Sequence, residues 1–273
     1  MVYRVGSKNF TAAAISTAAK AGEWVKSKQG EISQLSTKSS SKDLVTEVDK
    51  GTEKMIRKLL LTYFPSHAVL GEESVQPGPD AAAKALERLK DEEYVWIIDP
   101  IDGTTNYVHG FPFYSVSIAL AHRGELIVGV IYDPSSDEMF VAEKGKGAYL
   151  RGKRLSVSAE ERLQDSLIGG GFPPKPDLLA MNLQSLQKIA PKARNIRAAG
   201  SAALHLAYVA AGRLSGFFEF GLNPWDVAAG TLIIQESGGT VTDRSGAPYA
   251  LSTRNIVASN GRIHHELIQA LNE

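Results

Sequence analysis

A near-continuous apolar strand that ends in two carboxylates constrains this chain more than any other feature. The run begins at Tyr94, continues as VWII to Asp99, and is followed three residues later by Asp102, a glycine and two threonines. An apolar run bounded by turn residues is typical of a buried β-strand. Charged side chains rarely lie at the end of a buried strand unless a partner compensates for their burial. The sequence therefore predicts a buried sheet with a polar site at one strand end.

The patterns on either side of this strand predict stacked helices and sheets. Apolar residues at helical spacing indicate helices over 10–29 and 46–63. Alternating β-branched segments at 114–122 and 125–133 indicate a hairpin, and after about residue 160 strand and helix patterns alternate. Because layers of helix and sheet bury such faces against one another, we expect an α+β fold.

The length and charge of the chain limit its organisation and its partners. We expect a single domain over 1–273 made of two closely packed lobes, approximately 1–155 and 156–273. Lys+Arg and Asp+Glu number 30 each, so the formal net charge is zero and the composition gives no electrostatic footprint for nucleic acid or an anionic membrane. We expect neither as a partner, although a local basic patch stays open. No apolar run approaches the roughly 20 residues that span a bilayer, and the N-terminus lacks a signal-peptide pattern. We expect a cytoplasmic protein.

Further acids follow another strand or begin a helix. Glu72 and Glu73 of GEES follow a second apolar strand, and Asp226 lies in the first turn of a helix with Asn223 as N-cap and Pro224 as first residue. Turn, solvent or helix-terminus roles could explain each acid alone. Carboxylates that meet raise one another's pKa unless a cation neutralises them. Without any cysteine in the chain, such oxygen donors suit a hard ion such as Mg²⁺.

Three motifs resemble the signatures of the inositol monophosphatase family of Mg²⁺-dependent, lithium-sensitive phosphatases. They are GEES, WIIDPIDGTTNYVHGFPFYSVSIAL and NPWDVAAG, in the order and spacing of the family. The resemblance implies a layered αβαβα sandwich of the inositol monophosphatase and fructose-1,6-bisphosphatase type. It also implies a homodimer that hydrolyses phosphate monoesters, and the segment GGGFPPK resembles prokaryotic-type members.

The same resemblance implies a set of metal ligands. Glu72, Asp99 and the main-chain carbonyl of Ile101 would hold one Mg²⁺, and Asp99, Asp102 and Asp226 would hold a second. A third, weaker ion would use the same glutamate and waters. Paired metals lower the pKa of a bound water and stabilise the leaving oxygen of a phosphate ester.

The resemblance implies catalytic and substrate contacts as well. Thr104, paired with Asp49, would position the attacking water. The backbone amides of Gly103 and Thr104 would donate hydrogen bonds to the phosphate. Other residues would contact the polyol or support the site. Beside the polyol we expect Gly200, Ser201, Ala202 and Glu219, and in support Lys38 and Glu73.

The motifs indicate the type of reaction, hydrolysis of a phosphate monoester, more specifically than they indicate which ester is the substrate. We expect inositol 1-phosphate, hydrolysed to myo-inositol and phosphate. Related enzymes with the same metal motifs cleave histidinol phosphate, sugar phosphates, fructose 1,6-bisphosphate or nucleotide phosphates, so these esters stay open. Some bacterial members of the family also act with the transcription machinery, so an additional regulatory binding role stays open.

Overall fold

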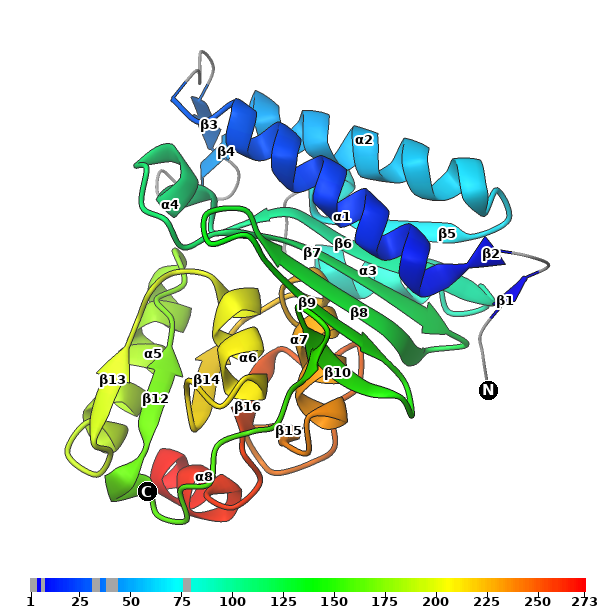
Figure 1. Ribbon diagram of the computed structural model, residues 1–273. Helices are drawn as coiled ribbons and strands as arrows, with labels where there is room; N and C mark the ends of the chain where they lie inside the picture. The colour runs from blue at the N-terminus through cyan, green and yellow to red at the C-terminus, as the bar shows by residue number, and fades with distance from the viewer. Residues whose placement is uncertain (1–3, 6–7, 31–34, 38–43, 76–79) are drawn as a thin grey trace.

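Two large β-sheets separate three layers of helices in the computed structural model, which describes residues 4–5, 8–30, 35–37, 44–75 and 80–273 (Figure 1). The layer order is the αβαβα sandwich that the sequence resemblance implied. The helices, including two short 3-10 helices η1 and η2, are α1 (Phe10–Ser27), α2 (Glu47–Tyr63), η1 (Glu72–Ser74), α3 (Ala81–Arg88), α4 (Thr104–Val108), η2 (Leu163–Asp165), α5 (Pro176–Ile189), α6 (Ala202–Ala210), α7 (Pro224–Glu236) and α8 (His264–Asn272).

A seven-stranded sheet packs against α1 and α2 on one face and against α7 on the other. Only β5 and β6 pair in parallel, and the other neighbours are antiparallel. The hairpin predicted at Arg123-Gly124 is confirmed, because His122 pairs with Glu125. Across the sheet the strands are β11 (Lys153–Arg154), β10 (Gly147–Leu150), β9 (Glu138–Glu143), β8 (Glu125–Asp133), β7 (Ser115–His122), β6 (Tyr94–Asp102) and β5 (Ala68–Gly71).

The apolar run of β6 is continuous because both faces of this strand are covered. Trp96 and Ile98 belong to the core beneath α1 and α2, whereas Ile97 belongs to the core on the opposite face. Side chains alternate between the two faces of a strand. A strand buried on both sides therefore needs apolar residues at every position, as the sequence predicted.

A five-stranded sheet lies between α6 and α7 on one side and α5 and α8 on the other. Its strands alternate in the same way, with Phe217 facing the central core and Phe218 the outer one. β12 pairs in parallel with β13 and β14, and β14, β16 and β15 pair antiparallel. Across the sheet the strands are β13 (Asn195–Arg197), β12 (Leu167–Gly170), β14 (Gly216–Phe220), β16 (Asn255–Ser259) and β15 (Thr240–Asp243).

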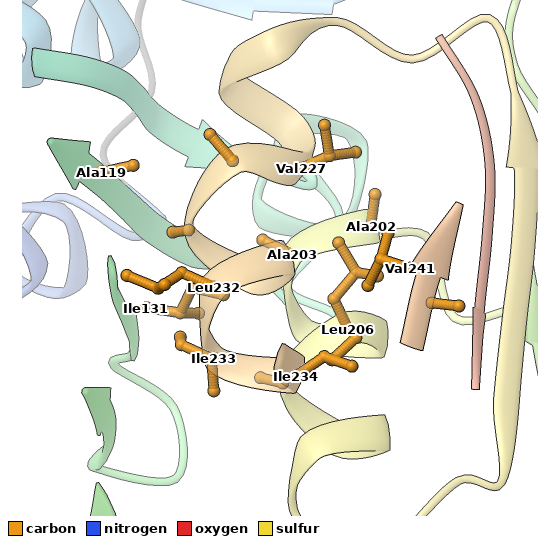
Figure 2. Close-up of a cluster of buried hydrophobic side chains, with 14 of the residues drawn as sticks. Ala119, Ile131, Ala202, Ala203, Leu206, Val227, Leu232, Ile233, Ile234 and Val241 are labelled. Atoms are coloured by element: carbon orange, nitrogen blue, oxygen red, sulfur yellow. The ribbon is translucent and has the colours of Figure 1, made fainter. Parts of the chain in front are cut away.

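Helix α7 packs closely in the central core between the two sheets. Figure 2 shows its residues Val227, Leu232, Ile233 and Ile234 among side chains of α6 and of both sheets. A Cβ atom at Gly129 of β8 would lie only 2.7 Å from a backbone oxygen of α7. The glycine therefore lets this helix approach the sheet.

Strand β6 continues through Pro100 to Asp102, three residues beyond the end of the apolar run at Asp99. Asp99 pairs with Ser117 and Asp102 with Ser115, so three steps on β6 face two steps on β7. One extra residue in a strand is a β-bulge, a position that tolerates proline. Residues three apart in a regular strand point to opposite faces. The bulge instead brings Asp99 and Asp102 to the same side.

The remaining elements are two short hairpins. The two large sheets divide the chain between Arg154 and Leu167, close to the predicted lobe boundary, and the division into two lobes stays a prediction. No helix in the described part of the chain is long and apolar enough to cross a membrane. The hairpins pair β1 (Arg4–Val5) with β2 (Lys8–Asn9) and β3 (Leu35–Thr37) with β4 (Leu44–Thr46).

Candidate active site

The end of β6 lies against the N-terminus of α6, and Asp102 joins the two elements. The backbone N–H of Ala203 donates to Asp102 Oδ2 at 2.8 Å, and the Ser201 hydroxyl donates to the same oxygen. Ser201 also caps the helix, since its Oγ accepts the Leu204 N–H at 3.2 Å. A helix N-terminus stabilises negative charge, so α6 supports the carboxylate of Asp102.

Two further predicted ligands are fixed by backbone donors. Asp99 is buried, and its Oδ1 accepts the Ile101 N–H at 3.0 Å. Asp226 lies in the first turn of α7, where its Oδ2 accepts the Asn223 N–H at 2.7 Å. The predicted start of this helix at Pro224 is confirmed. Both carboxylates therefore have fixed orientations.

The electrostatics show that four acids act on one another although they are far apart in the chain. Burial raises the pKa of Asp102 to about 6, and the charge of Glu72 raises it too. Burial also holds the pKa of Asp226 well above its ordinary value, with the charges of Glu72 and Asp102 adding to the effect. Burial and Asp102 raise the pKa of Glu219 to about 8. These residues form one cluster of mutually repelling carboxylates.

The donor set of this cluster suits a hard cation. Within the described ranges, no lysine, arginine or histidine forms an ion pair with Asp102, Asp226 or Glu219. In the same residues no three acidic or histidine side chains are grouped as a preformed metal cage. Buried charges are ordinarily paired or coordinated to metal, and carboxylate and carbonyl oxygens are the ligands that Mg²⁺ accepts. The chemistry of the residues therefore fits the ion, although their present arrangement does not enclose one.

Thr104 and Asp49 meet beside the cluster, as predicted. Thr104 Oγ1 lies 2.9 Å from Asp49 Oδ1 and 3.0 Å from the Ile101 carbonyl oxygen. Asp49 is fully buried, and its Oδ2 accepts hydrogen bonds from the backbone N–H and the hydroxyl of Thr46 at the start of α2. The hydroxyl of Thr104 can donate its one proton to Asp49, which leaves the lone pairs of Oγ1 as acceptors.

Two glycines allow the segments around Thr104 and Ser201 to touch. Gly103 has φ +94°, and a Cβ there would lie 3.2 Å from the Gly200 carbonyl oxygen. Gly200 has φ +88° and lies against the side-chain amide of Asn106. These left-handed conformations favour glycine, so both glycines have a structural reason beside their predicted role.

The remaining predicted positions have mixed outcomes. Glu219 is buried and does not face solvent. Its carboxylate lies so close to Gly171 that a Cβ atom at this glycine would overlap it. Ala202 is buried at the start of α6. The backbone N–H of Glu73 donates to Glu53 of α2. Lys38 lies outside the described residues.

Sequence reasoning missed two residues that hold this site together. The Asn106 side-chain amide donates to the carbonyl oxygens of Phe113 and Ala199, at 2.7 and 2.6 Å. It thereby ties α4 to the segment before α6. The Ala203 amide was missed because an alanine carries no chemical signal. Its place after the N-cap Ser201 is the feature that could have indicated an anion partner.

A separate groove of about 940 Å³ lies beside α3. It is lined by residues of α3, the ends of β7 and β8, α7 and the segment 249–252, and it includes none of the predicted site residues. Its charged rim residues Lys90, Arg123 and Lys144 form ion pairs with neighbouring acids. This groove is therefore separate from the carboxylate cluster at the end of β6.

The αβαβα sandwich thus carries buried carboxylates at strand ends and helix N-termini, beside a hydroxyl–carboxylate pair. Residues 7–273 match the inositol monophosphatase family. The chain belongs to that family, and it is a phosphoric monoester hydrolase.

Known proteins similar to this chain carry several names. Inositol monophosphatase 2 of Solanum lycopersicum is 42% identical over 270 residues, covering 97% of this chain and 99% of the relative. Nus factor SuhB of Pseudomonas aeruginosa is 42% identical over 236 residues, covering 85% and 83%. Fructose-1,6-bisphosphatase/inositol-1-monophosphatase of Thermotoga maritima is 37% identical over 244 residues, covering 89% and 88%.

A solved structure shares the whole fold. The crystal structure of extragenic suppressor protein suhB from Bartonella henselae superposes with a TM-score of 0.87 at 40% identity. The match covers 96% of this chain and 98% of that one. The predicted αβαβα class is thereby confirmed.

Proposed function

We propose that this protein is a Mg²⁺-dependent phosphatase that converts inositol 1-phosphate into myo-inositol and phosphate. The observation that carries the proposal is the carboxylate cluster of half-buried Glu72 with buried Asp102, Asp226 and Glu219. Burial, and then the charges of the neighbouring acids, raise the pKa of Asp102, Asp226 and Glu219. Such a cluster needs a cation when the acids are ionised. The family to which the chain belongs supplies the reaction type.

The proposed ligands are four carboxylates and one carbonyl. Glu72, Asp99 and the Ile101 carbonyl would hold one ion, and Asp99, Asp102 and Asp226 a second, with a weaker third ion at Glu72. When bound, Mg²⁺ would lower the pKa of a water and stabilise the leaving oxygen of the ester. The protein's part is to fix these oxygens, which the backbone N–H groups of Ile101, Ala203 and Asn223 support.

The attacking water is oriented by Thr104. Asp49 accepts the hydroxyl proton of Thr104 over the 2.9 Å contact, so Thr104 Oγ1 accepts a hydrogen bond from the water and directs its lone pair at phosphorus. The amides of Gly103 and Thr104, at the start of α4, donate to the phosphate oxygens. These groups stabilise charge that increases on the way to the transition state.

Recognition of the polyol is assigned to the segment of Gly200, Ser201 and Ala202 together with Glu219. Glu219 is buried and close enough to Asp102 for the charge of Asp102 to act on it. A carboxyl oxygen of Glu219 would accept a hydrogen bond from a substrate hydroxyl in place of water. Inositol monophosphatase 2 supports the inositol ester, and the double name of the Thermotoga maritima relative supports fructose 1,6-bisphosphate as the alternative.

Comparison of kcat/KM for inositol 1-phosphate, histidinol phosphate, fructose 1,6-bisphosphate and a nucleotide 2′-phosphate tests the substrate. A preference of tenfold or more for the inositol ester, which is about 1.4 kcal/mol of transition-state binding, is expected. A preference for another ester would keep the chemistry and reassign the substrate. Equal rates would indicate a broad phosphatase.

Two further properties are part of the proposal. Lithium in the millimolar range should inhibit turnover through the Glu72, Asp99 and Asp226 set, as in other members of the family, and full activity in lithium would contradict this. We also propose a homodimer, for which light scattering should give twice the 29.4 kDa of one chain. The cytoplasmic location remains a prediction from the sequence.

A regulatory binding role is the second candidate function. The Pseudomonas aeruginosa relative bears the name Nus factor SuhB, and a protein can bind a partner on a surface remote from its active site. The Asp99→Asn variant separates the two roles. Partner binding in cells that survives this substitution would support the second role, and loss of binding together with turnover would argue for catalysis alone.

A further inference from the structure

The predicted ligand Glu72 lies on a very short element that needs outside support. η1 has three residues, no side chain caps its N-terminus, and its closing backbone hydrogen bond joins the Val75 N–H to the Glu72 carbonyl oxygen at 3.2 Å. A single 3-10 turn has poor hydrogen-bond geometry of its own. The position of Glu72 therefore depends on what holds this turn.

Glu53 of α2 reaches across to the turn. Its carboxylate is almost fully buried, with 4% of the residue exposed, and its Oε2 accepts the Glu73 N–H at 2.7 Å. Gly71 makes room for it, because a Cβ there would lie 2.6 Å from the Glu53 carboxylate. Gly71 has φ −126°, which any residue adopts. Space, not backbone conformation, is the reason for glycine in GEES.

Arg57 completes the support on the next turn of α2. Its Nε donates to Glu53 Oε1 at 3.0 Å and balances the buried charge. Its terminal nitrogen donates to the Ser74 hydroxyl, which in turn donates to the Gly71 carbonyl oxygen at 3.0 Å. The middle and last residues of η1, Glu73 and Ser74, are thus attached to α2 by hydrogen bonds with charged groups, the stronger kind.

The same helix also carries Asp49, one turn before Glu53. Asp49 fixes Thr104, and Glu53 fixes the turn that bears Glu72. Since a helix is rigid over one or two turns, its displacement would move the water-orienting pair and the Glu72 turn together.

We propose that Glu53 and Arg57 are positioning residues for the metal site, acting through the Glu73 amide and Ser74 to orient Glu72 for Mg²⁺. This inference rests on the proposed function. Groups that orient metal ligands from outside the coordination shell typically change metal affinity or activity by roughly 10- to 100-fold when they are removed.

The test compares Mg²⁺ binding in two variants and a control. Glu53→Ala removes the carboxylate, and Gly71→Ala displaces it while keeping its charge. Lys54→Ala changes an exposed neighbour on α2. Calorimetric titration with MgCl₂ should show binding roughly tenfold or more weaker in the first two and unchanged in the control. Saturating Mg²⁺ should restore kcat to within a few-fold of wild type.

A measurement on metal-free protein separates support of the turn from simple loss of charge. Hydrogen exchange at the Glu73 amide should be slow in the wild type and faster in Glu53→Ala and Gly71→Ala, with Glu53→Gln, which keeps an oxygen acceptor, in between. Should Glu53→Ala fail to fold, Ser74→Ala at an exposed position removes the Arg57 contact and should weaken Mg²⁺ binding in the same direction.

The outcomes distinguish this inference from the proposed function. Variants that melt at a lower temperature but bind Mg²⁺ as the wild type does would reduce Glu53 to a structural role and overturn the inference alone. A wild type that binds no Mg²⁺ would overturn the proposed function, and the inference with it.

Discussion

At the scale of single residues, substitution of Thr104 tests the orientation of the attacking water without removing a proposed metal ligand. Its hydroxyl lies 2.9 Å from Asp49 and is not a proposed ligand. Thr104→Ala should lower kcat by about 10²–10³-fold, the usual cost of losing one preorganised hydrogen-bonding group of an active site, with little change in Mg²⁺ half-saturation. Thr104→Ser keeps the hydroxyl and should retain most of the rate. Unchanged turnover in the alanine variant would contradict the role of Thr104.

Glu219 gives the metal-free protein a pH-dependent stability. The folded-state pKa of Glu219, about 8, exceeds the ordinary value of 4.5. The contribution of this group to the free energy of unfolding is therefore fully present below about pH 4.5 and is lost as the pH rises through about 8. Between pH 7 and 9 the free energy of unfolding should fall by on the order of 1 kcal/mol from this group.

Urea unfolding of wild type and Glu219→Gln in EDTA measures this effect. The glutamine variant should show a smaller decline over the same range. The window avoids His67 and His205, since burial lowers the pKa of each to about 4 and their contribution changes between about 4 and 6.5. Identical declines in both proteins would contradict the raised pKa of Glu219.

At the scale of elements, the contact between β8 and α7 decides how the central layer is placed. Gly129→Ala would put a Cβ 2.7 Å from the Ala229 carbonyl oxygen and should destabilise the protein by about 1–3 kcal/mol, the usual cost of overpacking. Gly51→Ala is the control, because its Cβ would meet only Trp24 at 3.9 Å. In the interior of α2 it should stabilise by about 0.5–1 kcal/mol. Equal stabilities of the two variants by urea unfolding would contradict the close packing.

The elements also show how far the sequence alone could go. The helix that begins at Pro224, the hairpin at Arg123-Gly124 and the buried strand β6 were predicted because caps, turn residues and periodicity are local signals. The bulge that carries β6 past Pro100 was not, since it depends on pairing with β7. Local sequence patterns therefore predict which residues form a helix or strand better than they predict irregularities that depend on a neighbouring strand.

Site residues divide along the same line. Thr104 and Asp49 were predicted by resemblance, and the structure places them in contact. Glu53, Asn106 and the Ala203 amide were not, because their partners lie 20, 93 and 101 residues away in sequence. In the sequence, Glu53 also looks like an ordinary charged residue on the exposed face of an amphipathic helix, and only the structure shows that it is buried.

At the scale of the whole molecule, the site is a product of the complete fold. The proposed ligands and catalytic residues come from α2, η1, β6, α4 and α7, between Asp49 and Asp226. An unfolded chain does not hold such groups together, so ligand binding to the native state stabilises the entire fold. The acids repel one another, so we expect bound Mg²⁺ to stabilise the protein against unfolding.

The most direct test of this account is calorimetric titration of Mg²⁺ into wild type and Asp99→Asn, with phosphate release from inositol 1-phosphate measured on the same samples. We expect saturable binding and turnover that EDTA abolishes in the wild type. Asp99→Asn, which alters the proposed bridging carboxylate but keeps its size, should lose both. Turnover that persists in EDTA, or wild-type binding and rate in Asp99→Asn, would contradict the claim that this cluster is the catalytic metal site.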